Sequence, residues 1–197
     1  MGRTAQISRP AVLAAALRLA DEAGLEAVTM HAVGRHLGVT PMALYRHVPG
    51  KDALLDGLVE ALLAEVTETA AGPGPRPGTR PGDGPGAPPV PWEARLVALA
   101  YAIRDTARRH PAAFPLLLSR PAVTPAARDA RESVYLGLRD AGLPPGSIAR
   151  AERLVSTAVL GFAVSEAAGR FAGHDEAVID ADFTELLRWL RLAITSS

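Results

Sequence analysis

The sequence predicts an all-α protein of about nine helices, because three features of the chain agree on this fold class. Apolar residues recur at helical spacing through most of the 197 residues, and no strand-like alternation of useful length appears. Capping residues precede the apolar segments, and glycine or proline follows them. Hydrophobic residues form 48% of the chain, which is typical of folded proteins.

Residues 1–50 are expected to form a small head of three helices. The first helix is predicted to begin after a cap at Ser8 and to end near Gly24, with an apolar face that repeats at helical spacing. The segment from Thr29 to Leu55 predicts two short helices around a glycine turn, followed at once by the start of another helix.

The glycine turn has the local chemistry of a helix-turn-helix. Thr29 can cap the first of the two helices, and Gly34 is small where two helices must cross closely. Gly38 can supply a left-handed turn, while Thr40 caps the second helix and Pro41 takes its first position. In proteins of this plan the second helix enters the major groove of DNA.

A connecting helix is expected over residues 51–70, followed by a linker over residues 71–91. The helix places Leu55, Leu58, Val59, Leu62 and Val66 on one face. The linker is mostly glycine and proline, so it is predicted to be disordered or partly extended. Residues 92–197 are expected to form the second domain. A linker of this composition cannot transmit force, so the connecting helix is expected to couple the head to this domain by packing.

The sequence of the second domain predicts a bundle of helices whose boundaries are marked by prolines. The expected helices cover residues 92–110, 125–142, 147–173 and 181–194, with a short apolar segment over 114–118. Residues 154–164 are apolar nearly all round, which predicts burial on several sides.

Composition excludes several functions. The net charge is zero, but up to Lys51 six bases face three acids, and five acids without a base follow from Asp52 to Glu68. This basic head favours phosphate locally. The chain has no cysteine, no apolar run of bilayer length and no signal-peptide core, so we expect a cytoplasmic protein without membrane contact. No catalytic motif, metal site or cofactor site is predicted, and the acids between His174 and Asp182 are interpreted as a solvated loop.

The segment LGVTPMALYRHVPGKDALL, within a three-helix head that precedes a helical bundle, resembles the TetR family of bacterial transcriptional regulators. The resemblance is strongest from Ser8 to Val66, and the bundle resembles the tetracycline-repressor-like branch. It implies a repressor that binds a palindromic DNA operator as a homodimer and is released by a small-molecule effector of unknown identity. An effector-independent activator or architectural protein with the same head is the alternative, and an enzyme is not expected.

Nine head residues are candidate DNA contacts. The start of the recognition helix reaches base edges, and Arg46 lies one turn further on. The resemblance implies phosphate contacts for Thr29, Tyr45, His47 and Lys51, while Arg3 and Arg9 are expected to follow phosphates. Tyr45 and His47 could instead pack in the core. Met42 could simply face solvent, and Thr40 could serve only as a helix cap. The full set is Thr29, Thr40, Pro41, Met42, Ala43, Tyr45, Arg46, His47 and Lys51.

The bundle is expected to supply dimerisation and an effector pocket. A two-fold dimer places two recognition helices on successive major grooves. The helix over 147–173 and the last helix are the predicted interface, with an intramolecular core as the alternative. The interface residues are Ala158, Gly161, Ser165, Gly169, Leu186, Leu190 and Ile194. The pocket that the resemblance implies is largely apolar, and its candidates are otherwise core or surface residues. The pocket candidates are Tyr101, Arg104, His110, Phe114, Leu117, Val155 and Phe162.

Overall fold

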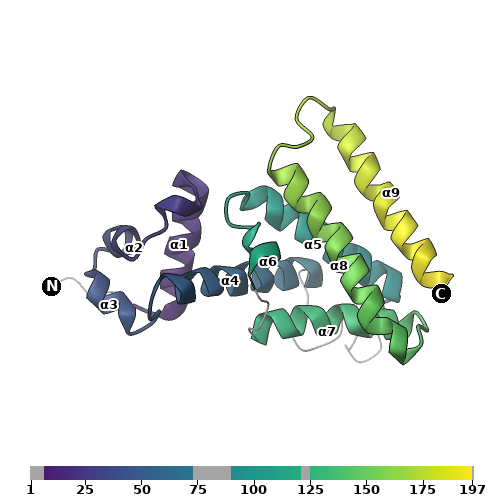
Figure 1. Ribbon diagram of the computed structural model, residues 1–197, viewed down its shortest axis with the longest axis horizontal. Coiled ribbons are helices and arrows are strands. Elements are labelled where there is room, and N and C mark those ends of the chain that lie inside the picture. Colours follow the sequence, from purple (N-terminus) through teal and green to yellow (C-terminus); the bar gives the residue numbers. More distant parts are fainter. Residues whose placement is uncertain (1–6, 73–89, 121–124, 197) are drawn as a thin grey trace.

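The computed structural model describes residues 7–72, 90–120 and 125–196, and the regular structure in these residues is entirely helical (Figure 1). They form nine α-helices and one short 3-10 helix, which confirms the predicted fold class. The expected linker lies almost wholly outside the described residues, as does Arg3. No helix among the described residues is long and apolar enough to cross a membrane.

The head consists of α1 (Arg9–Ala23), α2 (Met30–Leu37) and α3 (Pro41–Tyr45), with the 3-10 helix (Leu25–Ala27) between the first two. The Ser8 hydroxyl caps α1 by accepting a hydrogen bond from the Ala11 amide at 3.3 Å, as expected. The Thr29 hydroxyl caps α2 in the same way, 3.1 Å from the Ala32 amide.

The α2–α3 turn departs from the prediction at two residues. Gly38 adopts the expected left-handed conformation, with φ of 68°. A Cβ on Gly34 would lie 2.9 Å from the Val39 carbonyl oxygen, so a small residue is required by the turn rather than by a crossing helix. Thr40 precedes α3 in extended conformation, but its side chain makes no capping hydrogen bond. The predicted cap at Thr40 is therefore wrong.

The long helix α4 (Lys51–Ala71) leads from the head to the bundle, where it packs against α5, α6 and α7 (Figure 1). The bundle contains α5 (Trp92–Arg109), the short α6 (Leu116–Ser119), α7 (Pro125–Asp140), α8 (Pro145–Ala167) and α9 (Glu176–Thr195).

Two bundle boundaries differ from the prediction. Helix α8 ends at Ala167 rather than near 173, because Gly169 turns the chain with φ of 74°. Helix α9 begins at Glu176, five residues earlier than expected, because the Asp175 carboxylate accepts a hydrogen bond from the Ala177 amide. The acids that follow Glu176 therefore lie on a helix and not in a loop.

One hydrophobic core joins the head to the bundle. Val12, Leu44 and Leu58, from α1, α3 and α4, share this core with Ala113 and Phe114 from the segment before α6. Phe114 is fully buried there. Two smaller cores lie within the bundle, around Leu138 and around Phe183. Because the main core is continuous, the head cannot tilt freely without repacking the segment around Phe114.

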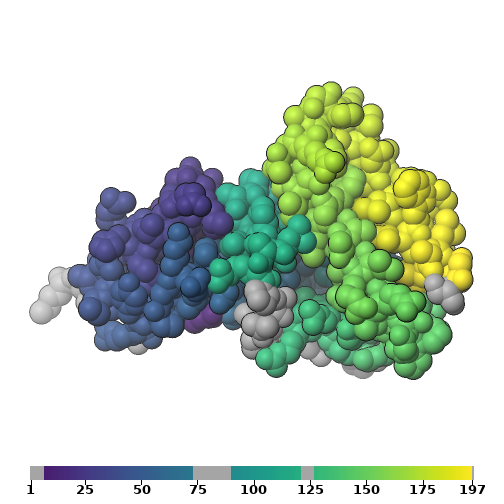
Figure 2. Space-filling view, in the orientation of Figure 1, coloured from purple at the N-terminus to yellow at the C-terminus, as the bar shows by residue number. Residues whose placement is uncertain are grey.

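The prediction that residues 154–164 are buried on several sides is wrong for the single chain. Only Val159 and Ala163 of this stretch are buried, whereas Leu154 is 65% exposed. Helices α8 and α9 lie side by side and form the surface at the end of the molecule away from the head (Figures 1 and 2). One face of α8 therefore has no covering element among the described residues.

Candidate DNA-binding surface and bundle cavity

Helix α3 presents its first turn and its last residues to solvent. Its apolar anchor is Leu44, which is fully buried in the main core. Met42 is 75% exposed, the largest exposed fraction among the large apolar side chains of the described residues, and Tyr45 is 46% exposed. Thr40 and Arg46 are exposed, while Pro41, Ala43 and His47 are half-buried. Helix α3 is therefore anchored by one buried side chain, and the rest of its surface is accessible to a partner.

The cations around α3 form no ion pair within the described part of the chain. Arg35, Arg46 and Lys51 are all exposed, and no carboxylate lies within ion-pairing distance of them. Lys51 is the first residue of α4, where the unpaired amides of the helix end favour an anion. Arg9 differs, because it donates to Glu60 at 2.7 Å. The expectation that Arg9 follows phosphates therefore requires this bond to break.

The capping difference between two threonines of the head gives a stability prediction. Thr29→Ala is expected to lower the free energy of unfolding by about 1 kcal/mol, because it removes the cap of α2. Thr40→Ala, the matched control, should change it by less than about 0.5 kcal/mol, since Thr40 makes no cap bond. Urea unfolding measures both, and equal losses in the two variants would contradict the assignment.

Charged side chains line the junction between the bundle and the head. The His110 ring lies between two carboxylates, with Nδ1 2.9 Å from Asp21 of α1 and Nε2 3.0 Å from Glu65 of α4. Arg109 also pairs with Glu65. Arg120, just after α6, donates to the Asp56 carboxylate at 2.7 Å. These bonds fix the segment from 109 to 120 onto α1 and α4.

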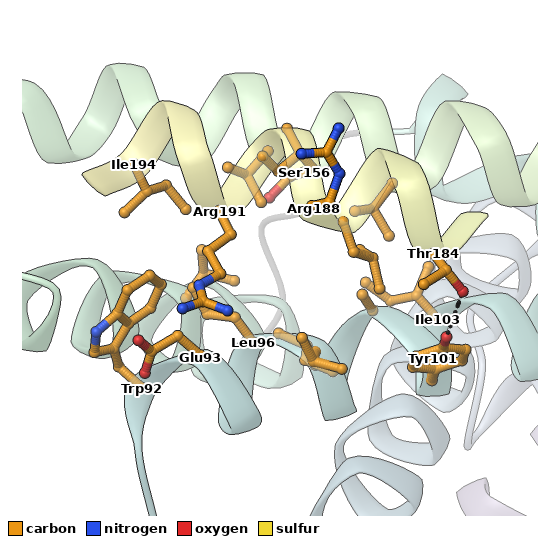
Figure 3. Close-up of a pocket in the computed structure, with 18 residues that line it drawn as sticks. Trp92, Glu93, Leu96, Tyr101, Ile103, Ser156, Thr184, Arg188, Arg191 and Ile194 are labelled. Atoms are coloured by element: carbon orange, nitrogen blue, oxygen red, sulfur yellow. Dashed lines mark hydrogen bonds between the residues drawn. The ribbon is translucent and has the colours of Figure 1, made fainter. Parts of the chain in front are cut away.

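A cavity of about 270 Å³ lies in the bundle, between α5 and α9 and next to α8 (Figure 3). Its walls are mostly aliphatic, and polar side chains lie mainly at its two ends, with Ser156 and Arg188 between them. Trp92, Glu93 and Arg191 lie at one end, and Tyr101 and Thr184, whose hydroxyl oxygens are 3.3 Å apart, lie at the other. A largely apolar cavity with a few polar groups is typical of small-molecule sites.

Two of the seven pocket candidates, Tyr101 and Val155, line this cavity. The structure places the other five elsewhere. His110, Phe114 and Leu117 belong to the junction with the head, where polar contacts or the main core engage them. Phe162 packs on Phe171 and Phe183. The apolar character of Phe114, Leu117 and Phe162 suits a core as well as a pocket, so the sequence pattern does not separate the two roles.

Arg104, the remaining candidate, is buried in an ion-pair network. Its guanidinium donates to both carboxylate oxygens of Glu166 at 2.6 and 2.7 Å and pairs with Asp180 at 2.7 Å. It also lies 4.8 Å from the ring centre of Phe183. Arg108 donates to Glu166 and lies near Glu176. Arg104 is thus neither a solvated residue nor free for an anionic effector.

The network predicts a pH-dependent stability. Burial raises the pKa of Glu166, but the hydrogen bonds from Arg104 and Arg108 outweigh burial and hold this pKa below its ordinary value. The resulting stabilisation is present above the ordinary value of about 4.3 and is lost as pH falls through the lower folded pKa. Glu166→Gln should therefore destabilise the chain at neutral pH, and urea unfolding should show this difference shrinking below about pH 4. A difference that is constant with pH would contradict the prediction.

The predicted dimer residues fall into two groups. On α8, Ala158, Gly161 and Ser165 lie on the same stripe as the exposed Leu154, and a Cβ on Gly161 would meet open space. Gly169 is exposed in the turn after α8. On α9, Leu186 and Leu190 pack around Phe183 instead, and Ile194 is buried in another core. These three residues therefore pack inside the bundle, which was the alternative role given for them, whereas the large exposed apolar residues of α9 lie on another face.

Sequence reasoning missed the exposed stripe of α9 and most of the cavity lining. Val178, Trp189 and Leu192 are the large exposed apolar residues of α9, and their spacing of eleven and three residues places them on one helical face. The cavity residues of α9, such as Leu187, share the helical pattern that had been assigned to a dimer interface. Asp175, Glu176 and Asp180 cap or pair, and no described cluster of His, Asp or Glu has the arrangement of a metal site.

The geometry of α2, α3 and the turn between them places the chain in the class of helix-turn-helix proteins. Residues 12–58 match the family described as "Bacterial regulatory proteins, tetR family". Residues 96–190 match the description "Tetracyclin repressor-like, C-terminal domain". Together the two matches cover most of the chain, which belongs to the TetR family of transcriptional regulators. The predicted resemblance, including the branch of the bundle, is confirmed.

Individual relatives agree with this membership. The chain is 34% identical over 172 residues to the HTH-type transcriptional repressor DrrR1 of Streptomyces coeruleorubidus; the match covers 87% of this chain and 58% of that relative. BioQ bound to its natural double-stranded DNA operator superimposes with a TM-score of 0.72 at 25% identity, over 98% of this chain and all of BioQ. A TetR from Acinetobacter baumannii AYE in complex with minocycline gives 0.73 at 27% identity, over 95% and 96%.

Proposed function

We propose that the chain is a ligand-responsive transcriptional repressor that binds a palindromic operator as a homodimer. One observation carries the proposal. The head, which exposes α3 and the cation Lys51 without an ion-pair partner among the described residues, shares one hydrophobic core with a bundle that contains an apolar cavity. The BioQ complex with an operator and the TetR complex with minocycline support the two binding functions.

The DNA contacts follow from exposure and charge. In the proposal, Thr40, Pro41, Met42 and Ala43 face base edges, with Met42 and Ala43 suited to thymine methyl groups. Arg46 reaches a guanine or a phosphate from the end of α3. Thr29, Tyr45, His47 and Lys51 contact the backbone. The small number of hydrogen-bonding side chains at the start of α3 implies that DNA shape contributes to sequence choice.

The homodimer is proposed to form through the uncovered faces of α8 and α9. The stripe Leu154, Ala158, Gly161 and Ser165 offers close helix approach, and Trp189 of α9 is 59% exposed. Two such pairs would make a four-helix interface related by a two-fold axis. This interface would place two copies of α3 on successive major grooves, about 34 Å apart.

The effector is proposed to act through α5 and the segment from 109 to 120. Occupation of the cavity would bias the position of the C-terminal end of α5, where Arg109 and His110 are bonded to α1 and α4, and of the segment that follows it, where Arg120 is bonded to α4. A shift there changes the spacing of the two heads, so effector and operator would weaken each other's binding equally. This route does not require the linker over residues 71–91.

The DNA assignment is tested with duplex DNA that flanks the chain's own gene. Lys51→Ala is expected to weaken binding by about tenfold or less across all sequences. It should also reduce the slope of log affinity against log salt concentration by about one, because one phosphate contact is lost. Tyr45→Phe should weaken it to a smaller extent. Fluorescence anisotropy at several salt concentrations measures both variants. Arg139→Ala, which also removes an exposed cation, and Tyr135→Phe, both in α7, are the controls. If the head variants bind as the controls do, the backbone-contact assignment fails.

A further inference from the structure

The cavity beside α5 is long. Its lining residues extend along α5 from Trp92 to Tyr101, a distance of about 14 Å at 1.5 Å per residue. On α9 they extend from Thr184 to Ile194, which is about 15 Å. The cavity therefore suits an elongated molecule that reaches from one end to the other.

The walls between the two ends are mostly hydrocarbon, and the polar side chains there, Ser156 and Arg188, already donate to Glu152 and Glu185. Leu96, Leu99 and Ile103 line the α5 side, Val155 and Val159 the α8 side and Leu187 the α9 side. A polar group held against these walls would lose its hydration without a hydrogen-bond partner. Binding in the middle of the cavity therefore depends on apolar contact.

The charged side chains of the cavity are balanced. Arg188 donates to the Glu185 carboxylate at 2.7 Å, so its charge is already paired. Arg191 and Glu93 lie at the same end with opposite charges (Figure 3). A ligand with a net charge of either sign therefore meets a like charge as well as an opposite charge at that end, while it still loses hydration on entry.

The opposite end is neutral and presents hydroxyl groups. The Thr184 hydroxyl donates to the Asp180 carbonyl at 2.9 Å, and its oxygen lies 3.3 Å from the Tyr101 hydroxyl. With Thr184 committed as a donor, Tyr101 can turn its O–H from Thr184 to a ligand oxygen. Both side chains are exposed on one side, so this end is also an entrance.

We propose that the effector is an uncharged, elongated apolar compound with one hydroxyl or carbonyl oxygen, which Tyr101 and Thr184 bind. The apolar body lies along α5 toward Trp92. The inference rests on the proposed ligand-responsive function, and it adds the chemical class of the effector.

A head-group series tests the class. The probes are 1-decanol, decanoate and decylammonium, which share one chain length and differ in charge, and calorimetry with the full chain measures their affinities. We expect 1-decanol to bind at least ten times more tightly than either charged probe. Tyr101→Phe should weaken 1-decanol binding about fivefold, and Thr184→Val should also weaken it. Tyr135→Phe and Thr195→Val, the same changes outside the cavity, should not.

The outcomes separate the ligand class from the regulatory function. The class is overturned if either charged probe binds as tightly as 1-decanol, if no probe binds, or if the Tyr101 and Tyr135 variants behave alike. Operator affinity is measured separately with and without 1-decanol. Binding to the cavity without any change in operator affinity would leave the ligand class standing and remove the proposed release mechanism.

Discussion

Phe114→Ala is expected to lower the free energy of unfolding by about 3 to 5 kcal/mol, the range for removal of a fully buried phenylalanine. The ring lies in the core that α1, α3 and α4 share with the segment before α6. Its loss leaves a void between head and bundle, because the surrounding helices can close it only in part.

Urea unfolding measures this effect, and the shape of the transition adds a second readout. Phe171→Ala is the control, because Phe171 is half-buried in the turn after α8 and should cost less than about 2 kcal/mol. Separate unfolding of head and bundle in the Phe114 variant would further support the shared core. Equal losses in the two variants would show that Phe114 does not join head and bundle.

Arg104→Ala is expected to lower the free energy of unfolding by about 3 kcal/mol, because it removes two hydrogen bonds from the buried Glu166 carboxylate and leaves Arg108 as its partner. The two side chains are only 4% and 9% exposed, so water cannot replace the lost partner fully. Asp180 also loses a partner, although Arg108 remains nearby.

A double variant separates the pair from its parts. Arg104→Met combined with Glu166→Met should recover most of the stability, because well-packed apolar residues often replace a buried ion pair at little cost. Arg139→Ala, which removes an exposed partner of Glu132, is the control and should cost less than about 1 kcal/mol. A single Arg104 variant as stable as this control would contradict the buried network.

The sequence predicted the head well because its signals are local. The cap at Ser8, the cap at Thr29 and the left-handed Gly38 each depend on a few neighbouring residues, and all three were found where expected. Thr40 failed because a capping residue type does not guarantee the bond. Thr40 has the extended conformation expected before Pro41, but its hydroxyl accepts no hydrogen bond from the amides of α3.

The bundle was less predictable because packing partners are not local. Helical periodicity gives the apolar face of α9 but not whether that face meets its own chain or a second copy. Arg104 shows the same limit, since only the fold brings it to Glu166, 62 residues further on. Phe114 and His110 were assigned to a pocket because nothing in their spacing indicates that α1 and α4 fold against them.

The most direct test of the regulatory proposal is selection of duplex DNA by the full chain from a random-sequence library. The proposal predicts a palindromic site whose half-sites lie about 10 base pairs apart, centre to centre, or a multiple of that spacing. It also predicts that Met42→Ala changes the selected half-site, while Lys51→Ala keeps the sequence and lowers the affinity. Enrichment of no sequence, or of a single half-site without a symmetric partner, would contradict a dimeric operator-binding repressor.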